Sequence, residues 1–453
     1  MMKLALAAAR ATAFASRASG RGGGTTLPGR VLTALAPDAP RRLAARLSRG
    51  CVLVSATNGK TTTCALLAEV LRGRAQLARN SAGANLASGI ASALAVREAA
   101  TAELGLFECD EAALPAIADQ LHPRAIALGN LFRDQLDRYG ELELVAARWR
   151  DLIENLPPET TLVVAADDPL TASLVEQHPT VVRYGIDDPS VALAATPHAA
   201  DARFCVRCGH AYDYRATYVG HLSDYSCPNC GNERAPLDLA ARAIDLRGLD
   251  GTAFDLCRGD ERVRVELALP GLYNVENALA AAALAGVLGE PLDVIAEGLA
   301  RFHGAFGRFQ RLSLGTAELV LLLIKNPAGA NEVLRILPAD AASMLFALND
   351  RIADGRDVSW VWDVDWEVVA PRLRNVVCSG TRAGDAALRL KYAGVDPAAI
   401  EVVPDTAQAL DRLAELSAGG TGYVLPTYTA MLELQRIAAA RGLSRPYWEE
   451  AAA

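Results

Sequence analysis

The chain has 453 residues, enough for two or three domains with sizeable cores. Its formal charge of −8 argues against a general nucleic-acid binder, and no apolar run is long enough to span a bilayer. Residues 1–50 differ from the rest, because they carry nine Lys or Arg residues and one acidic residue, Asp38. The first 20 residues, which are rich in Arg, Ser and Ala, are typical of an organelle transit peptide or of a basic helix that rests on an anionic membrane.

Residues 51–63 predict a strand, a phosphate-binding loop and the start of a helix. The apolar run 51–54 breaks into Ser-Ala-Thr-Asn-Gly-Lys-Thr-Thr-Thr, and an apolar helical pattern follows. Such a loop aims backbone N–H groups and the positive end of a helix dipole at phosphate oxygens. Lys60 then reaches the terminal phosphates, and the Thr61 hydroxyl binds Mg²⁺. The expected nucleotide contacts are Thr57, Asn58, Gly59, Lys60, Thr61 and Thr62.

A second buried strand, 104–107, ends at Glu108, and Asp110 and Glu111 follow it. Carboxylates at the carboxyl end of a strand lie where α/β sheets bind ligands. We expect Glu108 to hold Mg²⁺ beside Thr61, with helix capping as the alternative. Asp110 and Glu111 are better placed to cap the helix that follows.

Further strands at 125–128 and 161–165 alternate with helical patterns, which indicates a parallel, doubly wound α/β sheet. The order of motifs resembles the central domain of the Mur ligase family. The matching motifs are the phosphate loop, the strand ending in Glu108, Asn130…Asp134-x-x-Asp137, Ala166-Asp167-Asp168-Pro169, Gly271-Leu272-Tyr273-Asn274-Val275-Glu276-Asn277 and Gly307-Arg308-Phe309. The resemblance implies that Asn274, Asn277 and Arg308 contact the nucleotide.

The chain departs from the Mur ligase pattern at two places. Ala56 stands where that family has a glycine, so a methyl group enters a turn that must approach phosphate closely. Many Mur ligases also use a carbamylated lysine of the central domain as a Mg²⁺ ligand, whereas no lysine occurs between Lys60 and Lys325. A second metal arrangement of that kind is therefore not expected.

Four cysteines predict a zinc site in an inserted lobe at about residues 199–240. Cys205-x-x-Cys208 and Cys227-x-x-Cys230 are separated by eighteen residues, and a glycine follows each pair. Two such pairs bring four thiolates into one tetrahedron around Zn²⁺, which leaves no position open for chemistry. We therefore expect a structural metal in a lobe too small to fold alone. A nucleic-acid-binding ribbon is the alternative, and the acidic host domain disfavours it.

A second βα pattern predicts a Rossmann-like C-terminal domain over 311–453, after a central domain over 51–310. Its motifs are Lys325-Asn-Pro-Ala-Gly, the acidic loop Asn349-Asp-x-x-Ala-Asp354-Gly-Arg-Asp357-Val-Ser-Trp-x-Trp-Asp and Leu425-Pro-Thr-Tyr-Thr-Ala-Met. With the four-cysteine insertion, they resemble the MurT family, the Mur ligase-like synthetase subunits of lipid II isoglutaminyl synthases. The resemblance runs from about residue 20 to about residue 442.

The resemblance implies ligase chemistry on a lipid-linked substrate. In that family ATP phosphorylates the α-carboxylate of D-Glu in the lipid II stem peptide, and ammonia converts the acyl phosphate to D-isoglutamine. Phosphoryl transfer to a carboxylate needs positioning and charge neutralisation more than covalent chemistry by the protein. Lys60 and Arg308 are the expected cations, and Glu108 is the expected catalytic metal ligand.

The ammonia is expected to come from a second chain. A class I glutaminase needs a nucleophilic cysteine on a Gly-x-Cys-x-Gly turn with a histidine base, and none of the nine cysteines has that context. The family supplies a GatD-like class I glutamine amidotransferase as heterodimer partner, and an aspartate of the C-terminal acidic loop completes that partner's Cys–His pair. We expect Asp357 in this role and Asp354 as second choice. A turn or capping role is the alternative for Asp357.

Two other functions stay open at this level. One is a stand-alone Mur-like amino-acid ligase of the folylpolyglutamate or cyanophycin type, which the zinc lobe and the acidic loop disfavour. The other is a non-catalytic nucleotide-binding zinc-ribbon scaffold, which stays open because of Ala56 and the missing lysine. The scattered cysteines fit a reducing cytoplasm, and residues 1–50 suit peripheral association with the inner face of the membrane, where lipid II lies.

Overall fold

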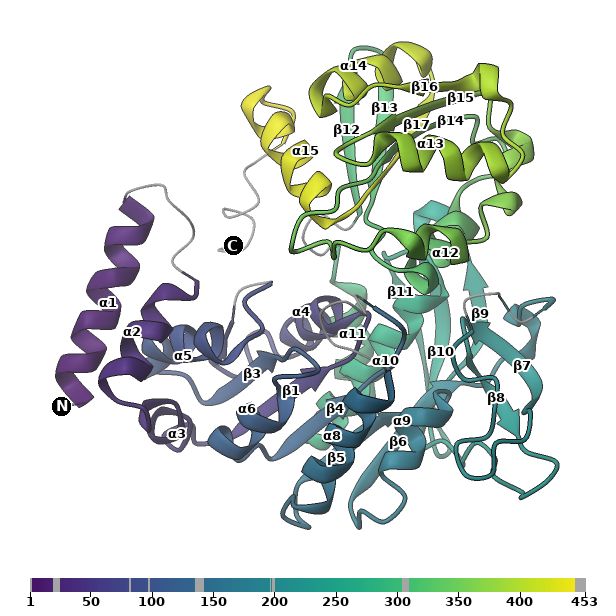
Figure 1. The fold of residues 1–453 in the computed structure, drawn as a ribbon. Helices are drawn as coiled ribbons and strands as arrows, with labels where there is room; N and C mark the ends of the chain where they lie inside the picture. Colours follow the sequence, from purple (N-terminus) through teal and green to yellow (C-terminus); the bar gives the residue numbers. More distant parts are fainter. Residues whose placement is uncertain are drawn as a thin grey trace.

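The computed structural model describes residues 2–18, 25–80, 83–96, 98–134, 142–195, 197, 200–303 and 309–444. Two α/β units make up most of this part of the chain, and the C-terminal unit lies above the first one in Figure 1. The Gly307-Arg308 motif and Asp137, both singled out from the sequence, lie outside the described residues. None of the helices within these ranges is long and apolar enough to cross a membrane.

The first unit is built on a nine-stranded sheet with the order β11-β10-β9-β6-β5-β4-β1-β3-β2. Its strands are β1 (Cys51–Ser55), β2 (Leu77–Arg79), β3 (Leu104–Glu108), β4 (Ala125–Leu128), β5 (Thr161–Ala165), β6 (Val181–Ile186), β9 (Leu239–Leu246), β10 (Thr252–Arg258) and β11 (Glu261–Leu267). Neighbouring strands from β2 to β9 are parallel, and β10 and β11 form an antiparallel edge. The central strands β1, β3 and β4 are buried along their whole length, as a parallel sheet covered on both faces requires.

Helices cover both faces of this sheet. Alternate residues of β1 enter different cores, with Val52 and Val54 in one and Cys51 and Leu53 in the other. The first core contains α4 (Lys60–Val70), α10 (Leu272–Val287) and α11 (Leu292–Ala300); the second contains α2 (Leu27–Leu35), α3 (Ala39–Ala44), α5 (Ala87–Ala95), α6 (Leu114–Leu121), α8 (Leu142–Glu154) and α9 (Pro169–Leu174). The prediction of a doubly wound sheet is confirmed.

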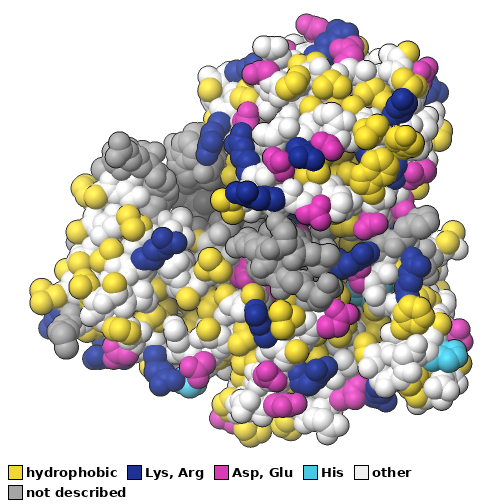
Figure 2. Space-filling view, viewed as in Figure 1, with side chains coloured by type: hydrophobic (Ala, Val, Ile, Leu, Met, Phe, Trp, Pro, Cys, Tyr) yellow, Lys and Arg dark blue, Asp and Glu magenta, His cyan; other side chains and the backbone are white. Residues whose placement is uncertain are grey.

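The N-terminal residues add a helix to one side of this unit. Helix α1 (Met2–Ala18) lies against α2 and α5, and its Ala5 and Ala9 are buried in the second core. Its other face is open to solvent, since Leu4 and Phe14 are 76% and 74% exposed. Hydrophobic side chains are correspondingly visible over the N-terminal helices at the left of Figure 2.

The C-terminal unit contains a six-stranded sheet with the order β12-β13-β17-β14-β15-β16, in which only β12 is antiparallel to its neighbour within the described residues. Its elements are β12 (Phe309–Leu314), β13 (Ala317–Leu322), β14 (Ser343–Ala347), β15 (Asn375–Ser379), β16 (Ile400–Val402), β17 (Thr421–Pro426), α12 (Pro327–Ile336), α13 (Ala383–Tyr392), α14 (Thr406–Leu416) and α15 (Tyr428–Ala440). Short 3₁₀ helices lie at Glu98–Ala100, Pro189–Val191, Gly248–Asp250, Ser359–Asp363, Trp366–Val368, Ala370–Arg372 and Pro397–Ala399.

The four-cysteine insertion leaves the large sheet between β6 and β9. It carries a two-stranded hairpin of β7 (Asp213–Val219) and β8 (Leu222–Ser226), which Figure 1 shows at the edge of the first unit. The strand order also fixes where a ligand can bind. Val54 of β1 is level with Glu108 of β3, and Ser55 is level with Leu128 of β4. The loops after β1, β3 and β4 therefore meet at one edge of the sheet.

Candidate functional site

The loop after β1 is shaped by Gly59, which immediately precedes α4. Its φ of 92° lies in the left-handed region that favours glycine, and a Cβ there would lie 1.8 Å from Asn277 Oδ1. The backbone N–H groups of Thr57 and Asn58 donate to the backbone and side-chain oxygens of Asn130, at 2.8 and 2.9 Å. The loop is thus held between the end of β4 and helix α10.

Thr61 and Glu108 meet as the sequence analysis anticipated. Thr61 Oγ1 donates a 2.8 Å hydrogen bond to Glu108 Oε2, and Asn85 Nδ2 lies 3.5 Å from Glu108 Oε1. Asn80 exchanges two hydrogen bonds with the backbone of Glu108, which fixes the end of β3. A hydroxyl and a carboxylate oxygen in contact beside a phosphate loop fit Mg²⁺, which takes few protein oxygens and completes its shell with phosphate and water.

Lys60 is buried and ion-paired with Glu111 instead of pointing into open space. Its Nζ lies 2.9 Å from Glu111 Oε2 and also donates to the carbonyl oxygen of Ala56 at 2.5 Å. Burial lowers the pKa of Lys60, but the charges of Glu111 and Glu108 outweigh that effect and the pKa is raised. The capping role predicted for Glu111 is therefore wrong, because its carboxylate is committed to Lys60. Asp110 accepts a hydrogen bond from the N–H of Ala112 in the turn before α6, but no side chain among the described residues caps that helix, so the capping role predicted for Asp110 is not found either.

The departure at Ala56 is accommodated without strain. Ala56 is not among the residues with positive φ, so its backbone conformation is one that alanine adopts readily. Its side chain is buried, and its carbonyl oxygen anchors Lys60 as described above. The missing glycine does not remove the phosphate loop from this fold.

A cleft with about 930 Å³ of empty space, part of it open solvent, extends from the phosphate loop to the C-terminal unit. Asn274 and Asn277, expected from the family resemblance to bind nucleotide, line it from α10, and Asn277 Nδ2 donates to Asn274 Oδ1 at 3.1 Å. The loop residues Asn58, Gly59 and Thr62 line its other end. Arg308, the remaining predicted contact, lies outside the described residues, so the structure does not place it.

The C-terminal unit contacts the phosphate loop directly, which the sequence analysis did not foresee. Lys325 Nζ donates to the carbonyl oxygen of Thr57 at 2.9 Å and to Asp134 Oδ2 at 2.7 Å. The side-chain amides of Asn326 and Asn58 exchange two hydrogen bonds, at 3.0 and 3.3 Å. The available signal was the scarcity of lysine, since Lys325 is one of only four in the chain. These contacts bring a second cation next to the phosphate loop.

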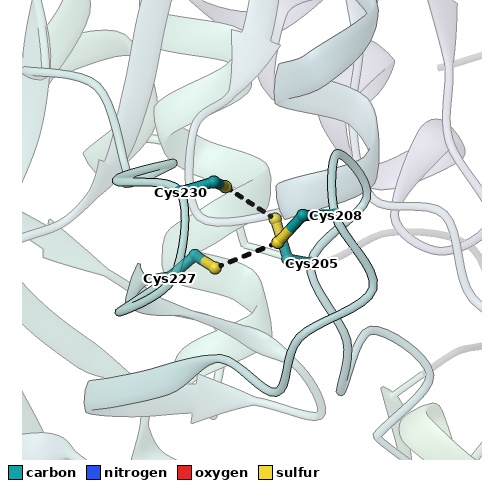
Figure 3. A group of neighbouring side chains, drawn as sticks. All are labelled: Cys205, Cys208, Cys227 and Cys230. Atoms are coloured by element: carbon teal, nitrogen blue, oxygen red, sulfur yellow. Dashed lines mark hydrogen bonds between the residues drawn. The ribbon is translucent and has the colours of Figure 1, made fainter.

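The four predicted zinc ligands form a tight cluster. The sulfur atoms of Cys205, Cys208, Cys227 and Cys230 all lie within 4.8 Å of one another, and Figure 3 shows them converging from two facing loops. Burial raises the pKa of the Cys205 thiol, but hydrogen bonds, mainly from the backbone, lower it overall to about 6. A backbone hydrogen bond from Asn232 lowers the pKa of Cys230, but burial and the neighbouring thiols raise it overall to about 12. Four sulfur atoms this close together, from two Cys-x-x-Cys pairs, fit a closed metal site.

The hairpin that extends from this cluster forms part of the cleft wall. Val219 and Leu222 line the cleft beside Phe132. The His221 ring lies 4.6 Å from the Phe132 ring, and a Cβ on Gly220 would lie 2.6 Å from the same ring. The insertion is therefore packed against the loop that follows β4, rather than projecting as an isolated lobe.

The two aspartates considered for the partner glutaminase have different surroundings. Asp354 is buried, and it accepts hydrogen bonds from the backbone N–H groups of Thr429 and Arg351. Burial raises its pKa in spite of these donors. Asp357 is exposed, and hydrogen bonds from the backbone and hydroxyl of Ser359 lower its pKa. Asp357 is thus an accessible carboxylate, whereas Asp354 holds the loop against α15.

The architecture and the site define a Mur-type ligase, and comparisons with known proteins agree. The Mur ligase middle domain family matches residues 54–221, and the MurT ligase C-terminal family matches residues 323–431. Among solved structures, a pseudomurein peptide ligase type C from Methanothermus fervidus superposes with a TM-score of 0.71 at 20% identity, over 88% of this chain and 80% of that one. MurF from Thermotoga maritima in complex with ADP superposes with a TM-score of 0.64 at 14% identity, over 93% and 84%.

The sequence relatives narrow this class further. The lipid II isoglutaminyl synthase (glutamine-hydrolyzing) subunit MurT of Streptococcus pneumoniae (strain ATCC BAA-255 / R6) is 32% identical over 98% of this chain and 98% of its own length. The protein of the same name from Staphylococcus aureus (strain N315) is 31% identical over 92% of this chain and 93% of its own length. The chain belongs to the MurT family, which confirms the resemblance noted from its motifs.

Proposed function

We propose that this chain is the synthetase subunit of a lipid II isoglutaminyl synthase. It is a carbon–nitrogen ligase that uses ATP to convert the α-carboxylate of D-Glu in the lipid II stem peptide to the carboxamide of D-isoglutamine, in peptidoglycan synthesis. The observation that carries this proposal is the near-complete alignment with a subunit of that name, over 98% of both chains. The phosphate loop, the Thr61–Glu108 pair and the cleft support it.

The reaction proceeds through an acyl phosphate. A carboxylate oxygen of the substrate attacks the γ-phosphorus of ATP, and ADP leaves; the nitrogen of ammonia then attacks the carbonyl carbon, and phosphate leaves. In this proposal Lys60 exchanges Glu111 for the γ-phosphate and neutralises its charge. Thr61 and Glu108 would hold Mg²⁺, which would supply charge neutralisation at the phosphates when bound. Asn274, Asn277, Arg308 and the loop residues 57–62 complete the nucleotide site.

The ammonia comes from a partner subunit, a GatD-like class I glutaminase. The cysteines outside the zinc cluster are Cys51, Cys64, Cys109, Cys257 and Cys378, and all five are buried. Burial raises the pKa of Cys51 and of Cys378 to about 12, the opposite of what a nucleophilic thiol needs. Exposed Asp357 is the residue we assign to the partner's Cys–His pair, where it would stabilise the imidazolium. Asp354 is less suited to this role, because it is buried and its carboxylate accepts a hydrogen bond from the backbone N–H of Thr429.

The remaining assignments concern zinc, domain limits and location. The metal of the four-cysteine cluster is structural Zn²⁺, as a closed sulfur tetrahedron favours. The proposed limits are a basic segment over 1–50, a central domain over 51–310 with the insertion at about 199–240, and a C-terminal domain over 311–453. The lipid-linked substrate requires work at the inner face of the membrane, and exposed Leu4 and Phe14 of basic α1 support peripheral contact there.

The test is an amidation assay read by mass spectrometry. The chain is purified with its candidate glutaminase partner and given lipid II, ATP, Mg²⁺ and either glutamine or ammonium. The stem peptide should change by the mass difference between a carboxyl and a carboxamide group with either nitrogen source, and Lys60→Ala should abolish both reactions. Asp357→Asn should lose the glutamine-dependent reaction and keep the ammonium-dependent one.

A matched control is Asp363→Asn, which alters another exposed aspartate further along the same loop. It should leave both reactions unchanged. A wild-type chain that binds ATP but amidates lipid II with neither nitrogen source refutes the proposal. Turnover with a free amino acid in place of ammonia would instead favour a stand-alone Mur-like ligase.

A further inference from the structure

The phosphate loop is held in place by the loop that follows β4. Thr57 Oγ1 accepts a 3.0 Å hydrogen bond from the backbone N–H of Phe132 and lies 3.3 Å from the carbonyl oxygen of the same residue. Asn130 accepts hydrogen bonds from the backbone N–H groups of Thr57 and Asn58. Residues 130–132 therefore form a supporting loop that sets the position of the groups to which phosphate oxygens would bind.

The four-cysteine insertion contacts this supporting loop through His221, at the turn of the β7–β8 hairpin. His221 is fully buried, and its ring lies 4.6 Å from the Phe132 ring. The ring nitrogens form no hydrogen bond within the described residues, but Nε2 lies 3.4 Å from Asp168 Oδ1, which is an ion-pair distance. Asp168 is buried as well, and its Oδ2 accepts a 2.8 Å hydrogen bond from the backbone N–H of Leu131. His221 therefore contacts the supporting loop directly at Phe132 and indirectly at Leu131.

The carboxyl group of Asp168 is charged in this environment. Burial raises its pKa, but the neighbouring His221 and hydrogen bonds from Leu131 and Thr171 lower the pKa overall. A buried charge that loses a partner is costly, so the residues around it rearrange to supply another donor or admit water. Removal of the imidazole would therefore disturb the supporting loop, because Leu131 is one of the remaining donors.

Two further hydrogen bonds join the insertion to the same region. The backbone N–H of Arg133 donates to Asp201 Oδ2 at 2.9 Å, before the first cysteine pair. Arg234 Nη1 donates to Asp167 Oδ1 at 2.7 Å, after the second pair. The metal cluster joins the two cysteine pairs, so it fixes these contacts and His221 relative to one another.

We propose that His221 is a positioning residue, which transmits the position of the metal-held hairpin to the phosphate loop through Asp168 and Phe132. His221 is fully buried and does not line the cleft, so it acts on a nucleotide only through these neighbours. Val219 and Leu222 of the same hairpin differ from it, because both line the cleft. The inference rests on the proposed function only in that the phosphate loop binds ATP.

The test compares ATP with adenosine, using the metal-loaded chain without lipid II or glutaminase. Isothermal titration calorimetry measures ATP binding, and NMR titration measures adenosine binding. His221→Leu removes the imidazole and fills its space; it should weaken ATP binding by about tenfold and leave adenosine binding within about twofold of wild type. Adenosine has no phosphate, so its affinity reports the cleft wall and not the phosphate loop. A hairpin that served only as a cleft wall would change both affinities alike.

Two variants serve as references. His221→Gln should keep ATP affinity within about threefold of wild type, because its amide nitrogen can donate to Asp168. Ser223→Ala is the matched control, since Ser223 is a buried residue of the same hairpin whose hydroxyl has no hydrogen-bond partner within the described residues. It should change neither affinity.

A second measurement needs no variant. Amide hydrogen exchange of the wild-type chain is compared with the metal bound and after its removal by chelation. Metal removal should speed exchange in the hairpin and also at Leu131 and Phe132, whose N–H groups donate to Asp168 and to Thr57.

The possible failures are separable. Wild-type ATP affinity in folded His221→Leu, or an equal loss of ATP and adenosine affinity, overturns the positioning role. An equal loss of ATP affinity in His221→Gln and His221→Leu also overturns it. Unchanged exchange at Leu131 and Phe132 in a metal-free chain whose hairpin has opened does so even where His221→Leu does not fold. A wild-type chain that does not bind ATP overturns the proposed function and the role of His221 with it.

Discussion

The ion pair between Lys60 and Glu111 gives a prediction that can be measured before any substrate is available. Both side chains are nearly buried, and their charged atoms are 2.9 Å apart. Two unit charges at that distance attract by about 6 kcal/mol at an effective dielectric constant of about 20, although the desolvation of both groups offsets much of this. Removing one partner leaves the other buried and unpaired, which typically costs about 3–5 kcal/mol.

We therefore expect Lys60→Met to destabilise the nucleotide-free protein by about 3–5 kcal/mol, because the buried carboxylate of Glu111 loses its ion-pair partner. At about 2–4 °C per kcal/mol for a cooperative unit of 150–250 residues, the unfolding midpoint should fall by roughly 6–20 °C. The double variant Lys60→Met/Glu111→Gln should recover about 2–3 kcal/mol relative to the sum of the single changes. Nucleotide binding should remain lost in the double variant, since the phosphate cation is still absent.

The pKa of Lys60 sets the pH range of this effect. A folded-state pKa raised above the unfolded value means that the stabilisation is complete below about pH 10.4 and is lost only as the pH rises past the folded value. The coupling measured by scanning calorimetry at about pH 7 and about pH 9 should thus agree.

The exposed pair Arg258–Glu261 serves as a control, with an expected coupling below about 1 kcal/mol. A Lys60→Met protein whose unfolding midpoint matches wild type, or a coupling no larger than that of the exposed pair, would refute the reasoning. Lys60 would then contribute to phosphate binding alone.

Three further predictions concern other parts of the chain. Gly59→Ala should abolish nucleotide binding in calorimetry, because its Cβ would displace Asn277, whereas Gly73→Ala, with φ of 74° and open space around it, should bind normally. Chelation of the metal, or Cys208→Ser, should weaken ATP binding by about tenfold or more, because the hairpin carries Val219 and Leu222 of the cleft wall. Normal ATP affinity in the metal-free protein would contradict this. Cys257→Ser, which alters a cysteine outside the cluster, is the control. Phe14→Ser should reduce sedimentation with anionic vesicles while Leu246→Ser does not, and equal sedimentation of both variants would exclude a role for α1.

The sequence alone was sufficient for features whose chemistry is local. A buried β-branched run followed by Gly59, Lys60 and Thr61 specifies strand, loop and helix within a dozen residues, because turn geometry and helix start are set by neighbours. The two Cys-x-x-Cys pairs likewise carry their own ligand spacing, and the sulfur atoms do converge. Glu108 was correctly expected beside Thr61, since strand ends of a parallel sheet share one edge.

Contacts between distant segments required the tertiary structure. The sequence predicts a helix-capping role for Glu111. Only the packing of β3 against β1 shows that its carboxylate pairs with Lys60. Nothing local links Lys325 to Thr57, because the two are brought together by the docking of one α/β unit on the other.

The zinc lobe and helix α10 also show what the sequence predicts and what only tertiary packing decides. Spacing predicts a metal site, but whether the hairpin projects or lines the cleft depends on its packing against Phe132. Likewise residues 271–277 predict a nucleotide-binding helix, while the burial of Glu276 beside Asp167 and Arg234 is decided by tertiary packing. Sequence determines such local geometry through bonded neighbours, whereas burial and charge pairing arise only when residues far apart in the chain exclude water together.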